Sequence, residues 1–118
     1  MNKPASHPKT NELVGRKPTS VTFVWDYIQF QFDGPCLTAI TLPVFRTATS
    51  VLLPGSAGWR DGLCSAIGVE VASSRIADDE LRIEFVNSAG ITVSLADEDY
   101  TGPEAINYEA LDGSTMVV

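Results

Sequence analysis

The feature that most constrains the fold is an approximate internal repeat between residues 14–41 and residues 67–95. Shifting the first segment by about 53 positions onto the second brings similar residues together. The matches are Gly15 with Gly68, Ser20 with Ser73, Asp26 with Asp79, Ile28 with Leu81, Phe30 with Ile83, Phe32 with Phe85 and, after one extra residue, Leu37 with Ile91 and Thr38 with Thr92. Two unrelated amphipathic hairpins could match equally well, so duplication and coincidence both stay open.

The two segments share a strand-like hydropathy pattern. Residues 27–32 and 81–85 alternate strictly between apolar and polar side chains, which predicts strands with one face towards the core and one towards water. Turn residues follow each of them, at Asp33-Gly34-Pro35 and at residues 87–90. Each segment therefore predicts a strand, a bend at an aspartate, a second strand, a turn and a third strand.

Short helical stretches precede both segments. Residues 10–15 suit one helical turn, and the four-residue spacing of Trp59, Leu63 and Ile67 predicts a short helix that ends at Gly68. Further strands are expected over residues 44–53, 105–111 and 116–118. The predicted fold class is α+β, a mostly antiparallel β-sheet or partly open barrel of about six to seven strands, built as two helix-then-three-strand repeats with one short helix. Residues 1–9 are expected to form a disordered N-terminal tail, and residues 10–118 a single α+β domain.

Charge is distributed unevenly along the chain. Residues 1–60 carry a net charge of +3 and residues 61–118 a net charge of −10, which together give −7. This balance argues against nucleic acid as a partner, since phosphate binding needs clustered Lys and Arg. The acidic half is either a solvated face or a surface that steers a basic protein partner. The partner-binding candidates are Asp97, Glu98, Asp99, Glu104 and Glu109.

No catalytic or metal-binding constellation is recognisable in the sequence. Cys36 and Cys64 lack paired spacing and are expected to be reduced, buried thiols, and the one histidine is His7. The segment 97–102 resembles the start of a calcium loop but lacks the glutamate of its twelfth position, so a structural loop is favoured. Asp26 and Asp79 could form a carboxylate pair, although an aspartate in a tight bend usually bonds to backbone amides. We expect no enzyme activity, no cofactor and no metal.

A pocket beside Trp59, Arg60 and Asp61 is the alternative site. An aromatic ring, a cation and a carboxylate next to a glycine-rich loop suit a small ligand or a binding hot spot. A buried tryptophan with a surface ion pair explains the same residues. The apolar runs are too short for a membrane helix and the N-terminus lacks a secretory signal, so a cytoplasmic location without membrane association is expected.

Several short motifs together resemble a family of small, functionally uncharacterised bacterial proteins. They are Leu13-Val14-Gly15-Arg16, Asp26-Tyr27-Ile28-Gln29-Phe30, Asp33-Gly34, Leu63-Cys64-Ser65-Ala66-Ile67-Gly68 and Gly102-Pro103-Glu104-Ala105, within residues 12–107. Ala66 departs from the larger residue that the family pattern has there. The resemblance implies a bacterial protein and supplies no reaction; in size and charge, such proteins are similar to immunity proteins that neutralise toxins.

Three functions remain open on the sequence. The leading one is a non-catalytic binding protein, of which an immunity-type inhibitor is one form, whose acidic surface engages a basic protein. The second is a small-ligand-binding domain or minor enzyme that uses the pocket near Trp59. The third is an oligomeric structural protein in which the basic half of one subunit pairs with the acidic half of another.

Overall fold

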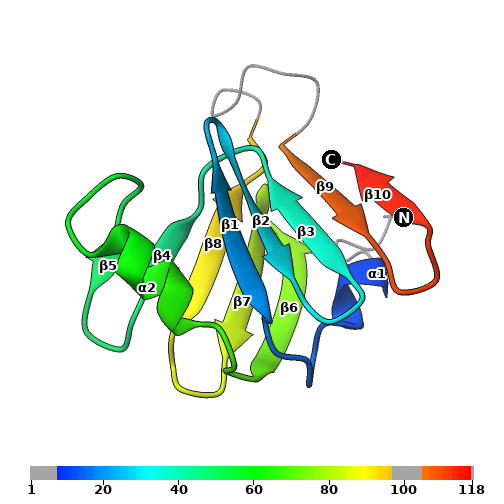
Figure 1. The fold of residues 1–118 in the computed structure, drawn as a ribbon, viewed down its shortest axis with the longest axis horizontal. Coiled ribbons are helices and arrows are strands. Elements are labelled where there is room, and N and C mark those ends of the chain that lie inside the picture. Colours follow the sequence, from blue (N-terminus) through cyan, green and yellow to red (C-terminus); the bar gives the residue numbers. More distant parts are fainter. Residues whose placement is uncertain (1–7, 97–104, 118) are drawn as a thin grey trace.

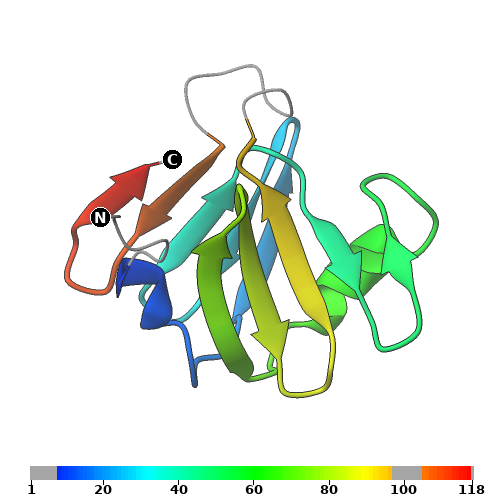
Figure 2. The same cartoon turned by 180° about the vertical axis from the view of Figure 1, so that it is seen from behind.

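The computed structural model describes residues 8–96 and 105–117, which form two five-stranded antiparallel sheets packed face to face (Figures 1 and 2). Sheet A has the order β1-β2-β3-β9-β10, with β1 Ser20–Val24, β2 Tyr27–Gln31, β3 Cys36–Ala39, β9 Ile106–Glu109 and β10 Thr115–Val117. Sheet B has the order β5-β4-β8-β7-β6, with β5 Val51–Leu52, β4 Val44–Arg46, β8 Gly90–Ser94, β7 Glu80–Phe85 and β6 Val71–Ala77. The helices are α1 Pro8–Asn11 and α2 Trp59–Ser65. Neither of these two helices is long and apolar enough to cross a bilayer, within the part of the chain described.

The predicted α+β class with mostly antiparallel strands is confirmed, whereas the predicted strand count is wrong. Within residues 8–96 and 105–117, the two sheets contain ten strands rather than six or seven, and they form no closed barrel. Residues 44–53, expected as one strand, form the hairpin β4–β5, whereas the strands expected over residues 105–111 and 116–118 are found as β9 and β10. The strands β4 and β5 are three and two residues long, too short for alternation to distinguish them from loop.

Each sheet joins a three-stranded meander to a hairpin from the other half of the chain. The meander β1-β2-β3 lies in sheet A, yet the next strand, β4, pairs with β8 in sheet B. In the same way the meander β6-β7-β8 lies in sheet B, and the next strand, β9, pairs with β3 in sheet A. The final hairpin of each half therefore belongs to the opposite sheet, so neither half has a complete sheet of its own.

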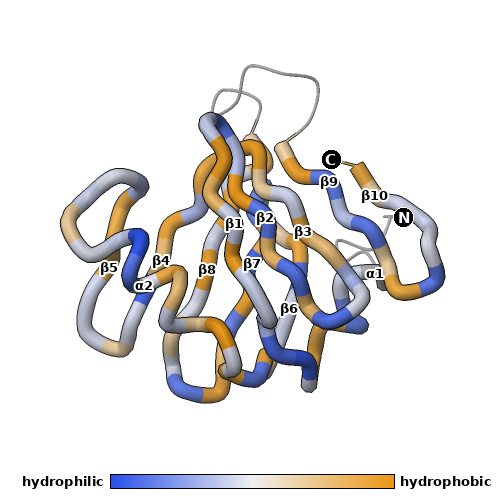
Figure 3. Tube along the Cα trace, viewed as in Figure 1, coloured by the Kyte–Doolittle hydropathy of each residue, from blue (hydrophilic) through white to orange (hydrophobic). Residues whose placement is uncertain are grey.

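The strand register is the same in both meanders. Phe30 pairs with Leu37 between β2 and β3, and Ile83, 53 positions after Phe30, pairs with Ile91 between β7 and β8. Along β2 and β7, successive side chains are alternately buried in the core and placed on the outer face, as the sequence predicted. Figure 3 colours the trace by the hydropathy on which this prediction was based. The two central strands therefore present their core residues at matching positions.

Two glycines link the halves by reciprocal hydrogen bonds. The N–H of Gly15 donates to the carbonyl of Val71 at 2.9 Å, and the N–H of Gly68 donates to the carbonyl of Pro18 at 2.9 Å. Their φ angles are +87° and +86°, a backbone conformation that favours glycine. Both residues thus bend the chain from a helical turn into the first strand of a meander.

The two-residue bends at the aspartates differ in conformation. Asp78 and Asp79, between β6 and β7, have φ angles of +54° and +60°, as expected for a type I′ hairpin turn. Trp25 and Asp26, between β1 and β2, are not among the residues with positive φ. The sequence correctly indicated a bend at both sites, but it gave no indication of this difference.

A single apolar core lies between the sheets and reaches the two short helices. Its largest fully buried side chains are those of Tyr108, Phe30, Phe32 and Phe45, which come from both sheets. Helix α2 lies beside β1 and β4 and contributes Trp59 and Leu63, while Leu13, just after α1, is fully buried. The core is therefore covered at its margins by these helical segments as well as by the sheets.

The predicted apolar face of α2 is wrong at its C-terminal end. The helix stops at Ser65, and Ile67 is 43% exposed, whereas Ala66 is buried in its place. The chain turns after Ala66 towards Gly68, so the four-residue spacing of Ile67 from Leu63 no longer describes a helical face. Within α2, a Cβ atom on Gly62 would lie 2.7 Å from Phe45 Cδ2, so this glycine permits close packing on β4.

One half-buried polar contact fixes the N-terminal segment to the end of β9. Glu12 Oε2 accepts hydrogen bonds from the Tyr108 hydroxyl and, at 3.0 Å, from the Leu111 N–H. The Tyr108 side chain is fully buried. Burial above all, and then the hydrogen bond and charge of Glu12, raise the pKa of Tyr108 well above its usual value. The contact joins residues far apart in the sequence across the margin of the sandwich.

Candidate functional site

A polar groove crosses the outer face of sheet A. Its volume is about 340 Å³, and it is lined by Tyr27, Gln29, Cys36, Thr38, Ile40, Asn107 and Glu109. These side chains share one face because the strand registers place them in cross-strand rows. In one row Thr38 lies between Gln29 and Asn107, and the Gln29 Nε2 donates to Thr38 Oγ1 at 3.3 Å. In the next row Cys36 lies between Gln31 and Glu109.

Glu109 is the one charged residue among those lining the groove. Its side chain is exposed, and it makes no ion pair with any residue of 8–96 or 105–117. The remaining lining groups are amides, hydroxyls, a thiol, an aliphatic side chain and a phenol ring. The groove therefore presents one uncompensated negative charge among neutral hydrogen-bonding groups.

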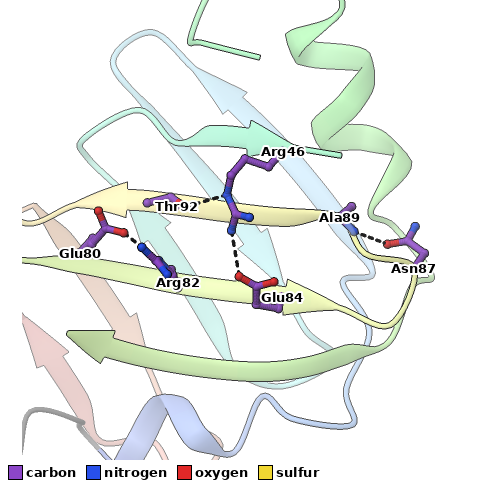
Figure 4. A network of polar contacts seen from close by, with 7 residues as sticks. All are labelled: Arg46, Glu80, Arg82, Glu84, Asn87, Ala89 and Thr92. Atoms are coloured by element: carbon purple, nitrogen blue, oxygen red, sulfur yellow. Dashed lines mark hydrogen bonds and ion pairs between the residues drawn. The ribbon is translucent and has the colours of Figure 1, made fainter. Parts of the chain in front are cut away.

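The outer face of sheet B has the opposite character, because its carboxylates pair with arginines. Glu84 Oε2 accepts from Arg46 Nη2 at 3.1 Å, and Glu80 Oε1 accepts from Arg82 Nε at 2.8 Å (Figure 4). Arg46 also donates through Nε to Thr92 Oγ1 at 3.3 Å. These contacts pair Glu80 and Glu84 with arginines, as on an ordinary solvated surface, while Arg75 on β6 forms no ion pair within the described residues.

Cys36 lies within the groove but is not activated as a nucleophile. Burial raises the pKa of the Cys36 thiol, the hydrogen bond with Thr38 opposes this, and the negative charge of Glu109 adds to the rise. The thiol therefore stays protonated at neutral pH, and a thiolate is the form that attacks electrophiles. Cys64 is exposed, so the prediction that both thiols are buried is wrong for it.

The groove contains one of the predicted partner-binding residues. Glu109 ends β9 at the groove, whereas Asp97, Glu98, Asp99 and Glu104 lie outside the described residues, as does the segment 97–102 compared with a calcium loop. Across residues 8–96 and 105–117, no group of three or more His, Cys, Asp and Glu side chains is arranged to bind a metal. Sequence reasoning expected Gln29 to face outward but missed the contributions of Cys36, Thr38 and Asn107.

Asp26 and Asp79 lie in bends of different sheets. Asp26 is in the β1–β2 connection and Asp79 in the β6–β7 connection, and no hydrogen bond or ion pair joins them among the described residues. The carbonyl of Asp79 accepts a hydrogen bond from the Leu95 N–H at 2.7 Å. This contact is made by the main chain of Asp79, so the expected bond from its side chain to backbone amides stays a prediction.

Of the three residues of the alternative pocket, Trp59 and Arg60 lie together and Asp61 lies apart from them. Trp59 is 3% exposed, and its Nε1 donates to the carbonyl of Pro43 at 2.8 Å. The guanidinium of Arg60 lies 5.7 Å from the Trp59 ring and 5.3 Å from the Phe23 ring. Asp61 is exposed and forms no ion pair within the described chain. Trp59 is therefore mainly a core residue with a cation above it.

A small hollow nevertheless lies beside Trp59. Its volume is about 50 Å³, and its lining includes Phe23, Leu42, Trp59, Arg60 and the hairpin-tip residue Trp25. Trp25 is 96% exposed, and sequence reasoning missed it. Its position in a two-residue bend, where a side chain has no sheet face to pack on, is the signal that could have found it.

Comparison with family models, with curated proteins and with solved structures gave no match to this chain. We therefore infer its function from the groove and its surroundings.

Proposed function

We propose that this chain is a non-catalytic binding protein that docks a basic protein partner on the outer face of sheet A. A cationic side chain of the partner would enter the groove beside Glu109. The observation that carries this proposal is the unpaired carboxylate of Glu109 in a groove without any lining cation. An immunity-type inhibitor is the form of this function that the small size and acidic charge of the chain favour.

The groove offers a guanidinium or ammonium group more than a single charge. The side-chain carbonyls of Gln29 and Asn107 and the hydroxyl of Thr38 can accept the remaining hydrogen bonds of such a group. The ring of Tyr27 provides an aromatic surface on which a cation can rest. An exposed ion pair contributes about 0–1 kcal/mol. Glu109 therefore supplies direction and specificity, while most of the affinity comes from the rest of the interface.

We also infer that the two halves of the chain arose by duplication. The matching registers of the meanders, the reciprocal bonds of Gly15 and Gly68, and the exchange of the final hairpins support this inference. Under the shift of about 53 positions, Gln29 corresponds to Arg82 and Gln31 to Glu84. One copy has thus kept or acquired internally paired charges on its outer face, and the other copy has neutral groups around a groove.

The acidic residues before β9 belong to the same proposal. Asp97, Glu98, Asp99 and Glu104 precede Glu109 in the sequence and would add to the attraction of a basic partner. Their contribution would be long-range and strongly reduced by salt, because screening acts over about 10 Å at 0.1 M ionic strength. Glu109 would differ from them by acting at short range in the groove.

Binding of a fluorescein-labelled hexa-arginine amide, measured by fluorescence anisotropy, tests the proposal. We compare the wild type with Glu109→Gln and with the matched control Glu70→Gln, which removes the same charge from an exposed position before β6. Glu109→Gln should weaken binding by up to about fivefold relative to Glu70→Gln, the upper range for an exposed ion pair. Equal effects of the two substitutions would mean that the net charge of the protein alone attracts the peptide, and would contradict a binding site in the groove.

A further inference from the structure

We propose that the tip of the β1–β2 hairpin, together with the start of α2, is a second anchor that binds a leucine-like side chain with a carboxylate beside it on a protein partner. The inference rests on the proposed binding function, but it uses none of the groove residues that bind the cation. Its components are the exposed Trp25, the small hollow next to it and the guanidinium of Arg60.

The apolar part of this anchor is preformed. Phe23 meets Trp59 edge to face, with ring centroids 6.2 Å apart and an interplanar angle of 73°. The hydrogen bond from Trp59 Nε1 to the Pro43 carbonyl holds the indole in place. Leu42 is 38% exposed at the rim of the hollow, and Trp25 is almost fully exposed. A hollow of about 50 Å³ admits the end of a branched aliphatic side chain, which Trp25 can then cover.

The charged part of the anchor sets the chemistry of the occupant. Arg60 is exposed, its guanidinium lies over two aromatic rings, and no carboxylate within the described residues pairs with it. A guanidinium held over rings keeps its N–H donors free at the edge and can bind a carboxylate in a bidentate manner. An aliphatic side chain adjacent to an acidic group therefore matches both the hollow and the cation.

The hollow and the groove are adjacent on sheet A. Val24 lines the hollow and Tyr27 lines the groove, and these two residues are directly opposite each other across β1 and β2. A large exposed aromatic side chain next to a preformed pocket is typical of a binding hot spot. One partner could thus place a basic side chain in the groove and an apolar-acidic pair at the hairpin tip, which fixes its orientation.

Titration with three small probes that share one branched tail tests this anchor. The probes are 4-methylpentanoate, the neutral 4-methylpentan-1-ol and the cationic 4-methylpentylamine. The chain has two tryptophans, so its two indole N–H signals in ¹H–¹⁵N spectra can be assigned with the Trp25→Phe variant. We expect the acid to shift both indole signals and to bind about fivefold more tightly than the alcohol, the upper range for an exposed ion pair. The amine should bind most weakly.

Two arginine variants separate this contact from general electrostatics. Arg60→Gln should abolish the difference between acid and alcohol, whereas Arg75→Gln, the same change at an exposed position on β6, should preserve it. Glu109→Gln should leave the affinities of the acid and the alcohol, read from the indole shifts, unchanged, so the anchor and the groove are tested independently. Equal binding of acid and alcohol by the wild type, or an unaltered preference in Arg60→Gln, would overturn the second anchor. The absence of any indole shift would overturn it as well.

Discussion

Removing the Tyr108 hydroxyl should destabilise the protein through a single buried contact. In Tyr108→Phe the ring remains, so the core keeps its volume and loses the hydrogen bond to Glu12. A hydrogen bond to a charged group contributes about 1.5–3 kcal/mol to the free energy of unfolding. We therefore expect a loss of about 2 kcal/mol at pH 7. For a chain of this length, such a loss lowers the Tm by about 8 °C.

The same contact predicts how the stability difference between the wild type and Tyr108→Phe depends on pH. The pKa of Tyr108 is raised in the folded protein, whereas the unfolded phenol ionises near pH 10. Above pH 10 the unfolded chain thus binds fewer protons than the native one, and the stability that the hydroxyl supplies decreases as pH rises. The gap between wild type and Tyr108→Phe should narrow by about 1 kcal/mol between pH 10 and pH 11, since one pKa unit corresponds to about 1.4 kcal/mol.

Urea unfolding followed by tryptophan fluorescence measures both effects, because Trp59 is buried in the native state. Tyr27→Phe is the matched control, because Tyr27 is half-buried on the outer face. The free energy of unfolding of this variant should differ from that of the wild type by less than about 0.5 kcal/mol. A Tyr108→Phe protein within about 0.5 kcal/mol of the wild type would refute the reasoning. So would a gap that stays constant above pH 10.

Three further substitutions or reactions test the packing and the thiols. Gly62→Ala should destabilise the protein by about 1–2 kcal/mol in urea unfolding, because overpacking against Phe45 outweighs the gain in helix propensity; a more stable variant would contradict the close approach. Gly68→Ala should cost about 1–2 kcal/mol in the same assay, since φ is +86° there, and no loss would mean the turn is not required. Iodoacetamide at pH 8 should modify the exposed Cys64 faster than the half-buried Cys36, because burial raises the pKa of the Cys36 thiol. Mass spectrometry measures the two rates, and faster modification of Cys36 would contradict its half-buried position.

The local features of the fold could be read from the sequence wherever the pattern was long enough. Residues 27–32 show enough alternation to predict β2 and its faces. The glycines at 15 and 68 have the positive φ angles of bends, but α2 ends at Ser65 rather than at Gly68. By contrast, β4 has three residues and β5 has two, so no periodicity can form, and one strand was predicted over residues 44–53. Gly62 illustrates the same limit. A glycine stands inside α2 because a side chain there would collide with Phe45, and no local pattern encodes that contact.

The candidate site depends on pairings between distant parts of the chain. Glu109 was a predicted binding residue because of its charge, but its place beside Cys36 follows from the pairing of β9 with β3. That pairing requires the final hairpin to cross to the other sheet, which alternation along one strand cannot indicate. Trp25 was missed although a local signal existed, because its position in the β1–β2 bend leaves it without a sheet face to pack on.

The most direct test of the central claim is to map where an arginine side chain binds. Acetyl-arginine amide is titrated into ¹⁵N-labelled protein, with acetyl-citrulline amide as the neutral isostere. The account predicts that the arginine compound alone shifts the backbone amides of Thr38, Asn107 and Glu109, and leaves those of Arg82 and Thr92 on sheet B unchanged. Shifts confined to sheet B, or equal shifts with the two compounds, would contradict a cation-binding groove on sheet A.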